Sequence, residues 1–119
     1  MPFYGEFDAA VVSLALHEMP PQVRENVWQS MQRAVRPQGH LIALDYAIPS
    51  SRGLWARMAL GLVEGDERSF LSIHPQHYEN FREFMASGGL DAWIQRRSEL
   101  LETVYNFWGG VISVTVCQR

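Results

Sequence analysis

The chain has 119 residues, of which 47% are hydrophobic and 19% charged, and its formal net charge is −3 at pH 7. These values are typical of one soluble globular domain, 1–119, and a weakly acidic chain gives no electrostatic reason to bind nucleic acid. The sequence has no apolar run that could span a membrane and no signal peptide, and its single cysteine, Cys117, suits a reducing compartment. We therefore expect a cytoplasmic protein with neither a membrane nor a nucleic-acid partner.

The first half of the chain is predicted to form a strand, a helix and a second strand. Residues 9–16 are a short, continuous apolar run, typical of a strand that is covered on both faces. Two prolines then open a helix over residues 20–35, whose spacing predicts Arg24 on the polar side, and the RPQG segment at 36–39 ends it. Residues 40–47 form the second strand. The short connections predict a right-handed crossover between parallel strands.

The second half is predicted to contain two helices and two strands. The first helix covers residues 54–64 and is broken by GDER at 65–68, and the second covers 75–89, closed by two glycines. Residues 92–101 are predicted as a half-exposed strand, and 111–118 alternate β-branched and small residues as a strand does. These last two strands are predicted to form an antiparallel hairpin, joined by an aromatic-rich link.

The order of these motifs carries a resemblance to a known family. The segments FDAAVVSLALHEMP, RAVRPQGHLIALDY and FMASGGLD, followed by the final strands, resemble the C-terminal half of class I S-adenosylmethionine-dependent methyltransferases. The nearest branch acts on small molecules and includes the ubiquinone and menaquinone biosynthesis enzymes. The resemblance implies an α/β fold with a partial Rossmann-like sheet: two parallel strands plus a C-terminal antiparallel hairpin, with helices mainly on one face.

The motif by which that family mainly binds its cofactor is missing from the sequence. In the family a first strand ends in a glycine-rich turn, where the backbone must approach S-adenosylmethionine closely. The glycines of this chain are isolated, or are paired beside the wrong elements. The resemblance therefore implies a truncated, methyltransferase-like domain that needs this site from elsewhere.

A truncated sheet would leave apolar surface uncovered. The strand at 9–16 would become a hydrophobic edge, which natural proteins avoid exposing. We expect one of three covers: a second copy of the chain in a homo-oligomer, a separately encoded N-terminal half, or the apolar helix at 54–63 folded across the sheet.

Polar side chains follow the two predicted parallel strands. Ligand sites of open α/β sheets lie beyond the carboxyl ends of the strands. The first strand ends at Leu16 and is followed by His17 and Glu18, and Asp45 and Tyr46 stand at the end of the second. We therefore expect His17, Glu18, Asp45 and Tyr46 to line a small-molecule substrate site on one rim.

The resemblance assigns roles on this rim. It implies that Ser13, Ala15 and Leu16 contact the cofactor, while His17 and Tyr46 face the substrate. His17 could serve as general base toward a phenol or an enol, because imidazole titrates near neutral pH. The alternative is that His17 and Glu18 only cap the strand and the helix that follows.

For the other candidates we favour a structural explanation over a functional one. His74 and His77 have a spacing that could supply two metal ligands, but no third ligand is near in the sequence, so we predict no metal site. Tyr105, Phe107 and Trp108 could line a substrate pocket or could pack over the edge of the sheet.

Two hypotheses for the whole chain follow from these observations. The first is a methyltransferase half that works when a partner or a second copy supplies the glycine-rich site. The second is a non-catalytic module that has lost cofactor binding and persists as an oligomeric or scaffold protein.

Overall fold

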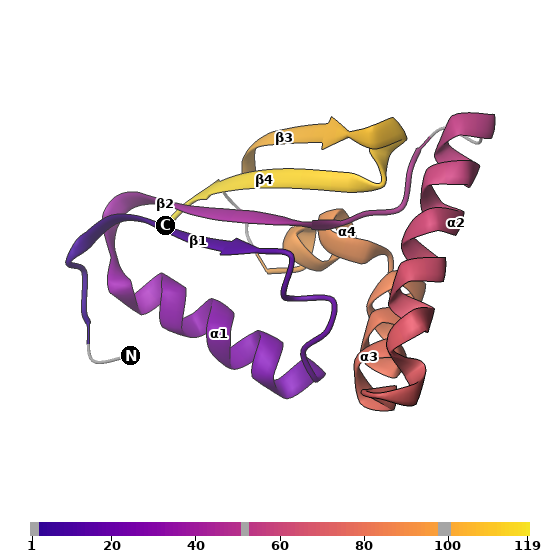
Figure 1. The fold of residues 1–119 in the computed structure, drawn as a ribbon. Coiled ribbons are helices and arrows are strands. Elements are labelled where there is room, and N and C mark those ends of the chain that lie inside the picture. Colours follow the sequence, from indigo (N-terminus) through magenta and orange to yellow (C-terminus); the bar gives the residue numbers. More distant parts are fainter. Residues whose placement is uncertain (1–2, 51–52, 98–100) are drawn as a thin grey trace.

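A computed structural model describes residues 3–50, 53–97 and 101–119. Among these residues one sheet of four strands has the order β1 (Phe7–Ser13), β2 (Val35–Tyr46), β4 (Ile112–Gln118) and β3 (Leu101–Phe107) (Figure 1). The pair β1–β2 is parallel, whereas β2–β4 and β4–β3 are antiparallel. The predicted partial Rossmann-like sheet, two parallel strands plus a C-terminal hairpin, is confirmed.

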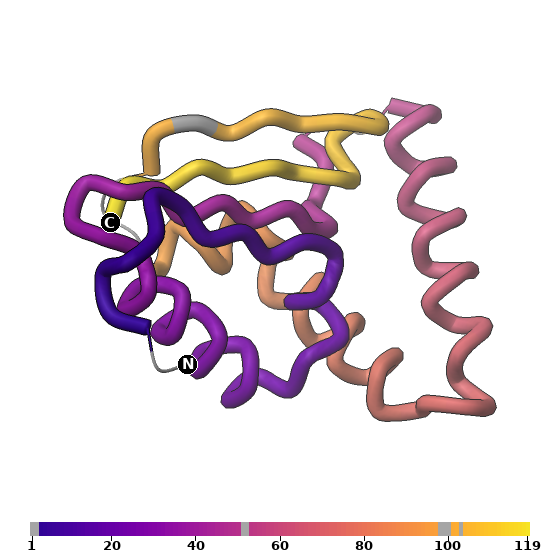
Figure 2. Tube along the Cα trace, turned by 60° about the vertical axis from the view of Figure 1, so that its left-hand side comes forward, coloured from indigo at the N-terminus to yellow at the C-terminus, as the bar shows by residue number. Residues whose placement is uncertain are grey.

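The helices lie on one face and at one end of this sheet. Helices α1 (Pro21–Ala34) and α4 (Gly89–Gln95) cover the face drawn below the sheet in Figure 1. Helices α2 (Leu54–Ser69) and α3 (Pro75–Ala86), joined by the short turn η1 (Phe70–Ser72), stand beyond the end of β2 (Figures 1 and 2). In the part of the chain that the structure describes, no helix covers the opposite face, as predicted.

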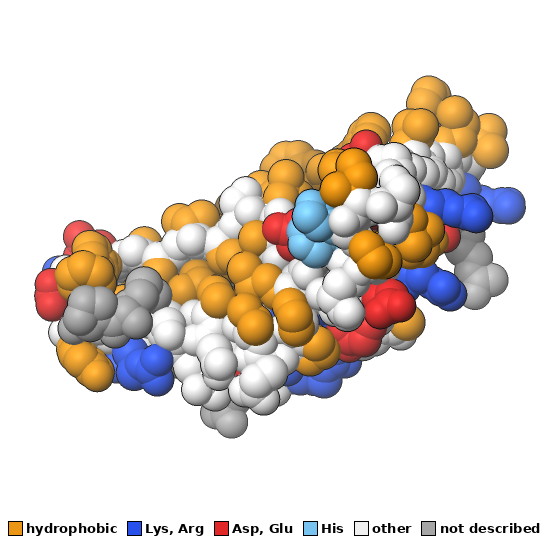
Figure 3. Space-filling view, turned by 60° about the horizontal axis from the view of Figure 1, so that its bottom comes forward, with side chains coloured by type: hydrophobic (Ala, Val, Ile, Leu, Met, Phe, Trp, Pro, Cys, Tyr) orange, Lys and Arg blue, Asp and Glu red, His pale blue; other side chains and the backbone are white. Residues whose placement is uncertain are grey.

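Helix α2 is longer than predicted and keeps an apolar side exposed. It runs through the GDER segment to Ser69, so the predicted break at 65–68 is wrong. Gly65 does not interrupt the helix, because only open space surrounds it and its backbone can stay helical. Trp55 and Leu62 remain largely exposed, and hydrophobic side chains gather at this end of the molecule (Figure 3, upper right).

The predicted strand at 92–101 is also wrong. Its described first part belongs to α4, whose buried residues Leu90, Trp93 and Ile94 recur at helical spacing. Residues 98–100 lie outside the described residues. The third strand is instead β3, the aromatic-rich segment that the sequence analysis assigned to a link, and it does form an antiparallel hairpin with β4.

The boundaries of the first two strands differ from the prediction because of local backbone geometry. Strand β1 ends at Ser13, since Leu14 takes a left-handed conformation with φ 47°. Strand β2 begins at Val35 and contains the RPQG segment as an irregularity in its pairing with β1. There Gln38 has φ 65°. The loop that carries His17 therefore starts earlier than expected.

Gly39, in the irregular part of β2, and Gly61, in helix α2, give a matched pair of predictions. A Cβ on Gly39 would lie 2.4 Å from Val35 Cγ1 and 2.7 Å from the Asp8 carbonyl oxygen, whereas one on Gly61 would meet nothing within 4 Å. We expect Gly39→Ala to lower the free energy of unfolding by about 2 kcal/mol through overpacking. Gly61→Ala should raise it by about 0.5–1 kcal/mol by favouring the helix. Urea denaturation measures both free energies. Equal effects would contradict the claim that a side chain at Gly39 overpacks the β1–β2 pairing.

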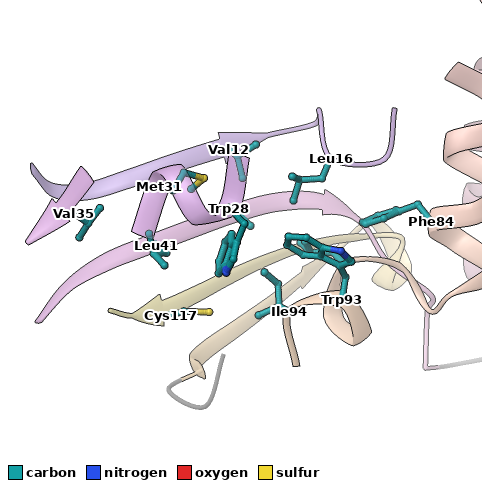
Figure 4. Close-up of a cluster of buried hydrophobic side chains, with 12 residues drawn as sticks. Val12, Leu16, Trp28, Met31, Val35, Leu41, Phe84, Trp93, Ile94 and Cys117 are labelled. Atoms are coloured by element: carbon teal, nitrogen blue, oxygen red, sulfur yellow. The ribbon is translucent and has the colours of Figure 1, made fainter. Parts of the chain in front are cut away.

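The core lies between the covered sheet face and helices α1 and α4. Trp28 of α1 and Trp93 of α4 meet edge to face with ring centroids 5.6 Å apart (Figure 4). Around them lie the inward side chains of the sheet and of the helices. These include Val12, Leu16, Met31, Val35, Leu41, Phe84, Ile94 and Cys117. This packing fixes α1 against β1 and so positions the loop between them.

The opposite sheet face is apolar and uncovered within the described residues. Val11 is 65% exposed and pairs in register with Ile42, which in turn pairs with Val116. The neighbouring rows of the same face continue with half-buried or exposed side chains: Leu44, Val114, Tyr105, Ile112 and Phe107. Helix α2 stands at the end of the sheet (Figure 1), so it is not the cover that one of our expectations placed there.

Candidate functional site

The loop after β1 is held in place by side chains from two helices. The Arg24 guanidinium donates to the backbone carbonyl oxygens of Leu16 (2.8 Å) and Met19 (2.9 Å). The Asn80 amide of α3 donates to the Glu18 carbonyl oxygen at 2.8 Å. Arg24 is almost fully buried, so the prediction that it lies on the polar side of its helix is wrong. It instead satisfies the carbonyl groups of a loop that turns into the protein.

Asp45 is the centre of the site. It is fully buried at the end of β2, and its Oδ2 accepts the backbone N–H groups of Leu16 (2.8 Å) and His17 (3.2 Å). Its Oδ1 accepts the N–H of Tyr46 at 2.8 Å and lies 2.6 Å from His17 Nδ1. Four donors therefore surround one carboxylate, as a buried charge requires.

His17 is held between two carboxylates. Its Nδ1 faces Asp45, and its Nε2 lies 3.2 Å from Glu67 Oε1 of α2. The ring is buried against Tyr46, with centroids 4.6 Å apart, and meets Phe81 of α3 edge to face. A histidine fixed at Nδ1 by a buried aspartate has a defined tautomer and orientation, which is what general-base chemistry at Nε2 needs.

Glu67 was missed in the sequence analysis because the helix was predicted to end before it. The buried residues of α2, namely Ala56, Ala59, Val63 and Glu67, recur at helical spacing. That spacing was the available signal, since it continues through the GDER segment to a carboxylate on the buried side.

The pKa values of these groups depend on one another. Burial lowers the pKa of His17, but the hydrogen bond with Asp45 and the nearby carboxylates of Asp45, Glu67 and Glu18 outweigh it, so the pKa is raised above 6.5. Burial raises the pKa of Glu67, although the charge of His17 opposes this. Burial and then the Glu67 carboxylate raise the pKa of Tyr46 to about 12. The carboxylates around His17 therefore favour its protonated form more than water favours that of a free imidazole.

We predict that nuclear magnetic resonance titration gives His17 a pKa above 6.5 and that Glu67→Gln lowers it. A raised pKa in the folded state means that the protonated form stabilises the fold. This contribution is full below pH 6.5 and is lost as pH rises through the folded pKa. The matched control is Glu102→Gln, which removes a carboxylate 3.2 Å from His40 at the surface and should leave His17 unchanged. An unshifted His17 in Glu67→Gln would contradict the coupling.

The structure brings most of the predicted substrate residues together. His17, Asp45 and Tyr46 form one contact group, as the strand order suggested. Glu18 is half-buried on the same loop, but its carboxylate lies 3.7 Å from His77 Nδ1 and so is directed toward α3. Their roles toward a substrate stay predictions.

The three residues predicted to contact the cofactor have different environments. Ser13 is exposed at the end of β1, and Ala15 is half-buried in the loop. The side chain of Leu16 lies in the core, and its backbone N–H and carbonyl groups are taken by Asp45 and Arg24. Leu16 therefore offers no free polar group to a ligand.

The other candidates also have defined positions. The rings of His74 and His77 stack with centroids 4.9 Å apart at the start of α3. Among residues 3–50, 53–97 and 101–119, no group of three or more His, Cys, Asp or Glu side chains could hold a metal ion. Within the same ranges, none of the helices combines the length and apolarity needed to cross a lipid bilayer. Trp108 lines a hollow that also includes Tyr46.

Comparisons with known proteins agree on the class of fold. No protein-family model matches the chain. An uncharacterized methyltransferase from Synechocystis sp. is 36% identical over 62 residues, covering 50% of this chain and 29% of that protein. The solved structure of an O-methyltransferase family protein from Burkholderia thailandensis matches with a TM-score of 0.50 and 20% identity, over 94% of this chain and 30% of that one.

A second solved structure, of a possible exported protein from Bordetella parapertussis, matches with a TM-score of 0.51 and 10% identity. It covers 98% of this chain and 40% of that one. The chain has a methyltransferase-like fold, as the resemblance implied. It spans less than a third of the length of the Synechocystis relative.

Proposed function

We propose that the chain is the acceptor-binding part of a cytoplasmic, S-adenosylmethionine-dependent methyltransferase that acts on a small molecule. The observation that carries this proposal is the buried contact between His17 Nδ1 and Asp45 at the carboxyl ends of β1 and β2. Ligand sites of open α/β sheets lie at this edge, and the methyltransferase-like fold supports the reaction class.

His17 acts as the general base in this proposal. Asp45 fixes Nδ1, so the neutral form of His17, present above its raised pKa, takes a proton at Nε2 from the hydroxyl group of a phenol or an enol. The Glu67 carboxylate lies 3.2 Å from Nε2, so in this proposal it must move away before the acceptor hydroxyl can reach that atom. The oxygen that loses its proton becomes the nucleophile, and S-adenosylmethionine, when bound, supplies the methyl group.

The described residues do not form a complete cofactor site. Ser13 and Ala15 lie at the exposed end of the strand, but the polar backbone groups of Leu16 are already used within the chain. The glycine pair that follows β3 at this edge, Gly109 and Gly110, packs closely against Ala56 and Pro49. In our proposal the glycine-rich site comes from a separately encoded N-terminal half, because a second copy of this chain could cover the sheet but would lack that site as well.

The position of β1 supports such a partner. Within the described residues β1 pairs on one side only, with β2, and Val11 beside that edge is largely exposed. An unpaired apolar edge and an uncovered sheet face are both surfaces that proteins normally cover. A partner that adds a strand beside β1 would bring its own backbone next to Ser13 and Ala15.

A non-catalytic oligomeric or scaffold module is the second candidate. It is favoured by one observation: both ring nitrogens of His17 face carboxylates, and His17 and Glu67 are both buried. In that case the contacts of His17 with Asp45 and Glu67 would serve only to join α2 to the sheet.

Two measurements on the chain test the proposed need for a partner. Calorimetric titration with S-adenosylmethionine should give no heat for the chain alone, because the cofactor site is incomplete. Sedimentation velocity should show a species larger than the monomer, and Val11→Lys should reduce it to the monomer without changing the circular dichroism spectrum. The control is Val23→Lys, on the exposed side of α1. Tight binding of the cofactor by a monomer would overturn the need for a partner.

A further inference from the structure

Helix α2 presents a ligand-sized surface whose own residues the proposed reaction does not use. Trp55, Met58, Leu62 and Asp66 follow one another along one side of the helix at spacings of three and four residues. Trp55 is 79% exposed, and Met58 and Leu62 are exposed as well. Large apolar side chains in a continuous exposed row usually mark a binding surface.

The tip of the β3–β4 hairpin, η2 (Trp108–Gly110), forms the opposite wall. A Cβ on Gly109 would lie 3.3 Å from the Ala56 Cα atom, so the two backbones are in close contact. Trp108 has φ 52°, a left-handed conformation that is unfavourable for a bulky side chain. Such strain is often found at ligand sites. Here it holds the indole, 54% exposed, beside α2.

Two hollows lie between these walls. They have volumes of about 250 and about 290 Å³ and lie side by side against Leu62 and Trp108, and we call the two together the trough. The first is lined by Trp55, Met58, Ala59, Leu62, Trp108 and Gly109, and the second by Tyr46, Leu62, Val63, Asp66 and Trp108. The trough therefore has aromatic side chains along its length and a carboxylate near one end.

The charged lining of the trough is negative. Asp66 is the one charged side chain among the described residues that line it. The basic residues of α2, Arg57 and Arg68, project from the other side of the helix by its 3.6-residue period. Burial and then the Glu67 carboxylate raise the pKa of Tyr46, with Asp66 adding to the effect, which is consistent with negative potential at this end.

We propose that this trough binds a small organic cation, an alkylammonium compound with an apolar body. Aromatic rings attract such cations through their negative faces, and the attraction is strongest where a carboxylate lies close by. The cation lies between Trp108 and Asp66, and its apolar part extends toward Trp55. The trough shares Tyr46 with the proposed substrate site, but the binding does not depend on methyl transfer, so it holds or fails apart from the proposed function.

The test compares two probes of the same shape. Choline and 3,3-dimethylbutan-1-ol differ by a positive nitrogen in place of a carbon atom. Titration followed by the indole N–H resonances should show choline perturbing Trp55 and Trp108, with an affinity roughly fivefold or more above that of the neutral alcohol. The buried Trp28 and Trp93 report on any change in the core and should not shift.

Variants assign the effect to the trough. Asp66→Asn should remove most of the preference for choline, whereas Glu79→Gln, which removes a carboxylate from an exposed position on α3, should keep it. Trp55→Ala should weaken binding without unfolding the chain, because Trp55 is largely exposed. Equal responses to both probes, no response at all, or full retention in Asp66→Asn would each overturn the proposal.

Discussion

Replacing Asp45 with asparagine is expected to lower the free energy of unfolding by about 2–4 kcal/mol. The side chain is fully buried and accepts hydrogen bonds from three backbone N–H groups as well as facing His17 Nδ1. An amide keeps the shape but loses the charge, and its NH2 group would face donors. Urea denaturation measures the loss, and the pKa of His17 should fall in the same variant because its main partner is no longer charged.

A surface aspartate provides the control. Asp8 pairs with Arg36 at 2.7 Å, but both side chains are well exposed. Asp8→Asn should therefore change stability by less than about 0.5 kcal/mol. If the two variants lost the same stability, Asp45 would not be the centre of the site.

Replacing Arg24 with methionine is the second large expected effect, a loss of about 3 kcal/mol. Methionine can fill the apolar space over the Phe84 ring, where the guanidinium carbon lies 4.6 Å from the ring centroid. It cannot donate to the carbonyl oxygens of Leu16 and Met19, which would be left unsatisfied. Chemical denaturation measures the effect. Hydrogen exchange should also show faster exchange in the loop that carries His17.

Arg33→Met on the same helix is the control for this variant. Arg33 is exposed and donates to Ser30 Oγ at 3.0 Å, an exposed local contact. Its replacement should change stability by less than about 0.5 kcal/mol. Loss of stability without faster exchange in the loop would mean that Arg24 acts through its packing over Phe84 or its ion pair with Glu83, and not by holding the loop.

The strand–helix–strand unit was predictable because its signals are local. A continuous apolar run, two prolines and a second apolar run determine β1, α1 and β2 with little help from the rest of the chain. The wrong prediction of a strand in place of α4 also had a local cause. The α4 segment carries its buried residues at helical spacing, but arginines that follow it were taken for the polar face of a strand.

The site was predictable only where adjacent strands determine it. His17 and Asp45 end neighbouring parallel strands, so their contact follows from the topology. Glu67 comes from a helix whose position against the sheet depends on packing with α3 and the hairpin tip. Arg24 escaped prediction for the same reason: helical spacing places it on the polar side, but a loop folds over it and makes that side internal.

The position of β4 has a consequence for how the molecule forms during synthesis. This strand lies between β2 and β3 although it follows every other described strand in sequence (Figure 1). Until the ribosome has made Gln118, β2 lacks its second neighbour, and the core side chains on it have no cover from Thr115 and Cys117. The apolar residues of the nascent chain therefore stay exposed until β4 pairs with β2. Because β2 and β4 are far apart in the sequence, this pairing is slow. Shortening the chain before Ile112 would remove β4 from the middle of the sheet, whereas removing β1 would take away only an edge strand.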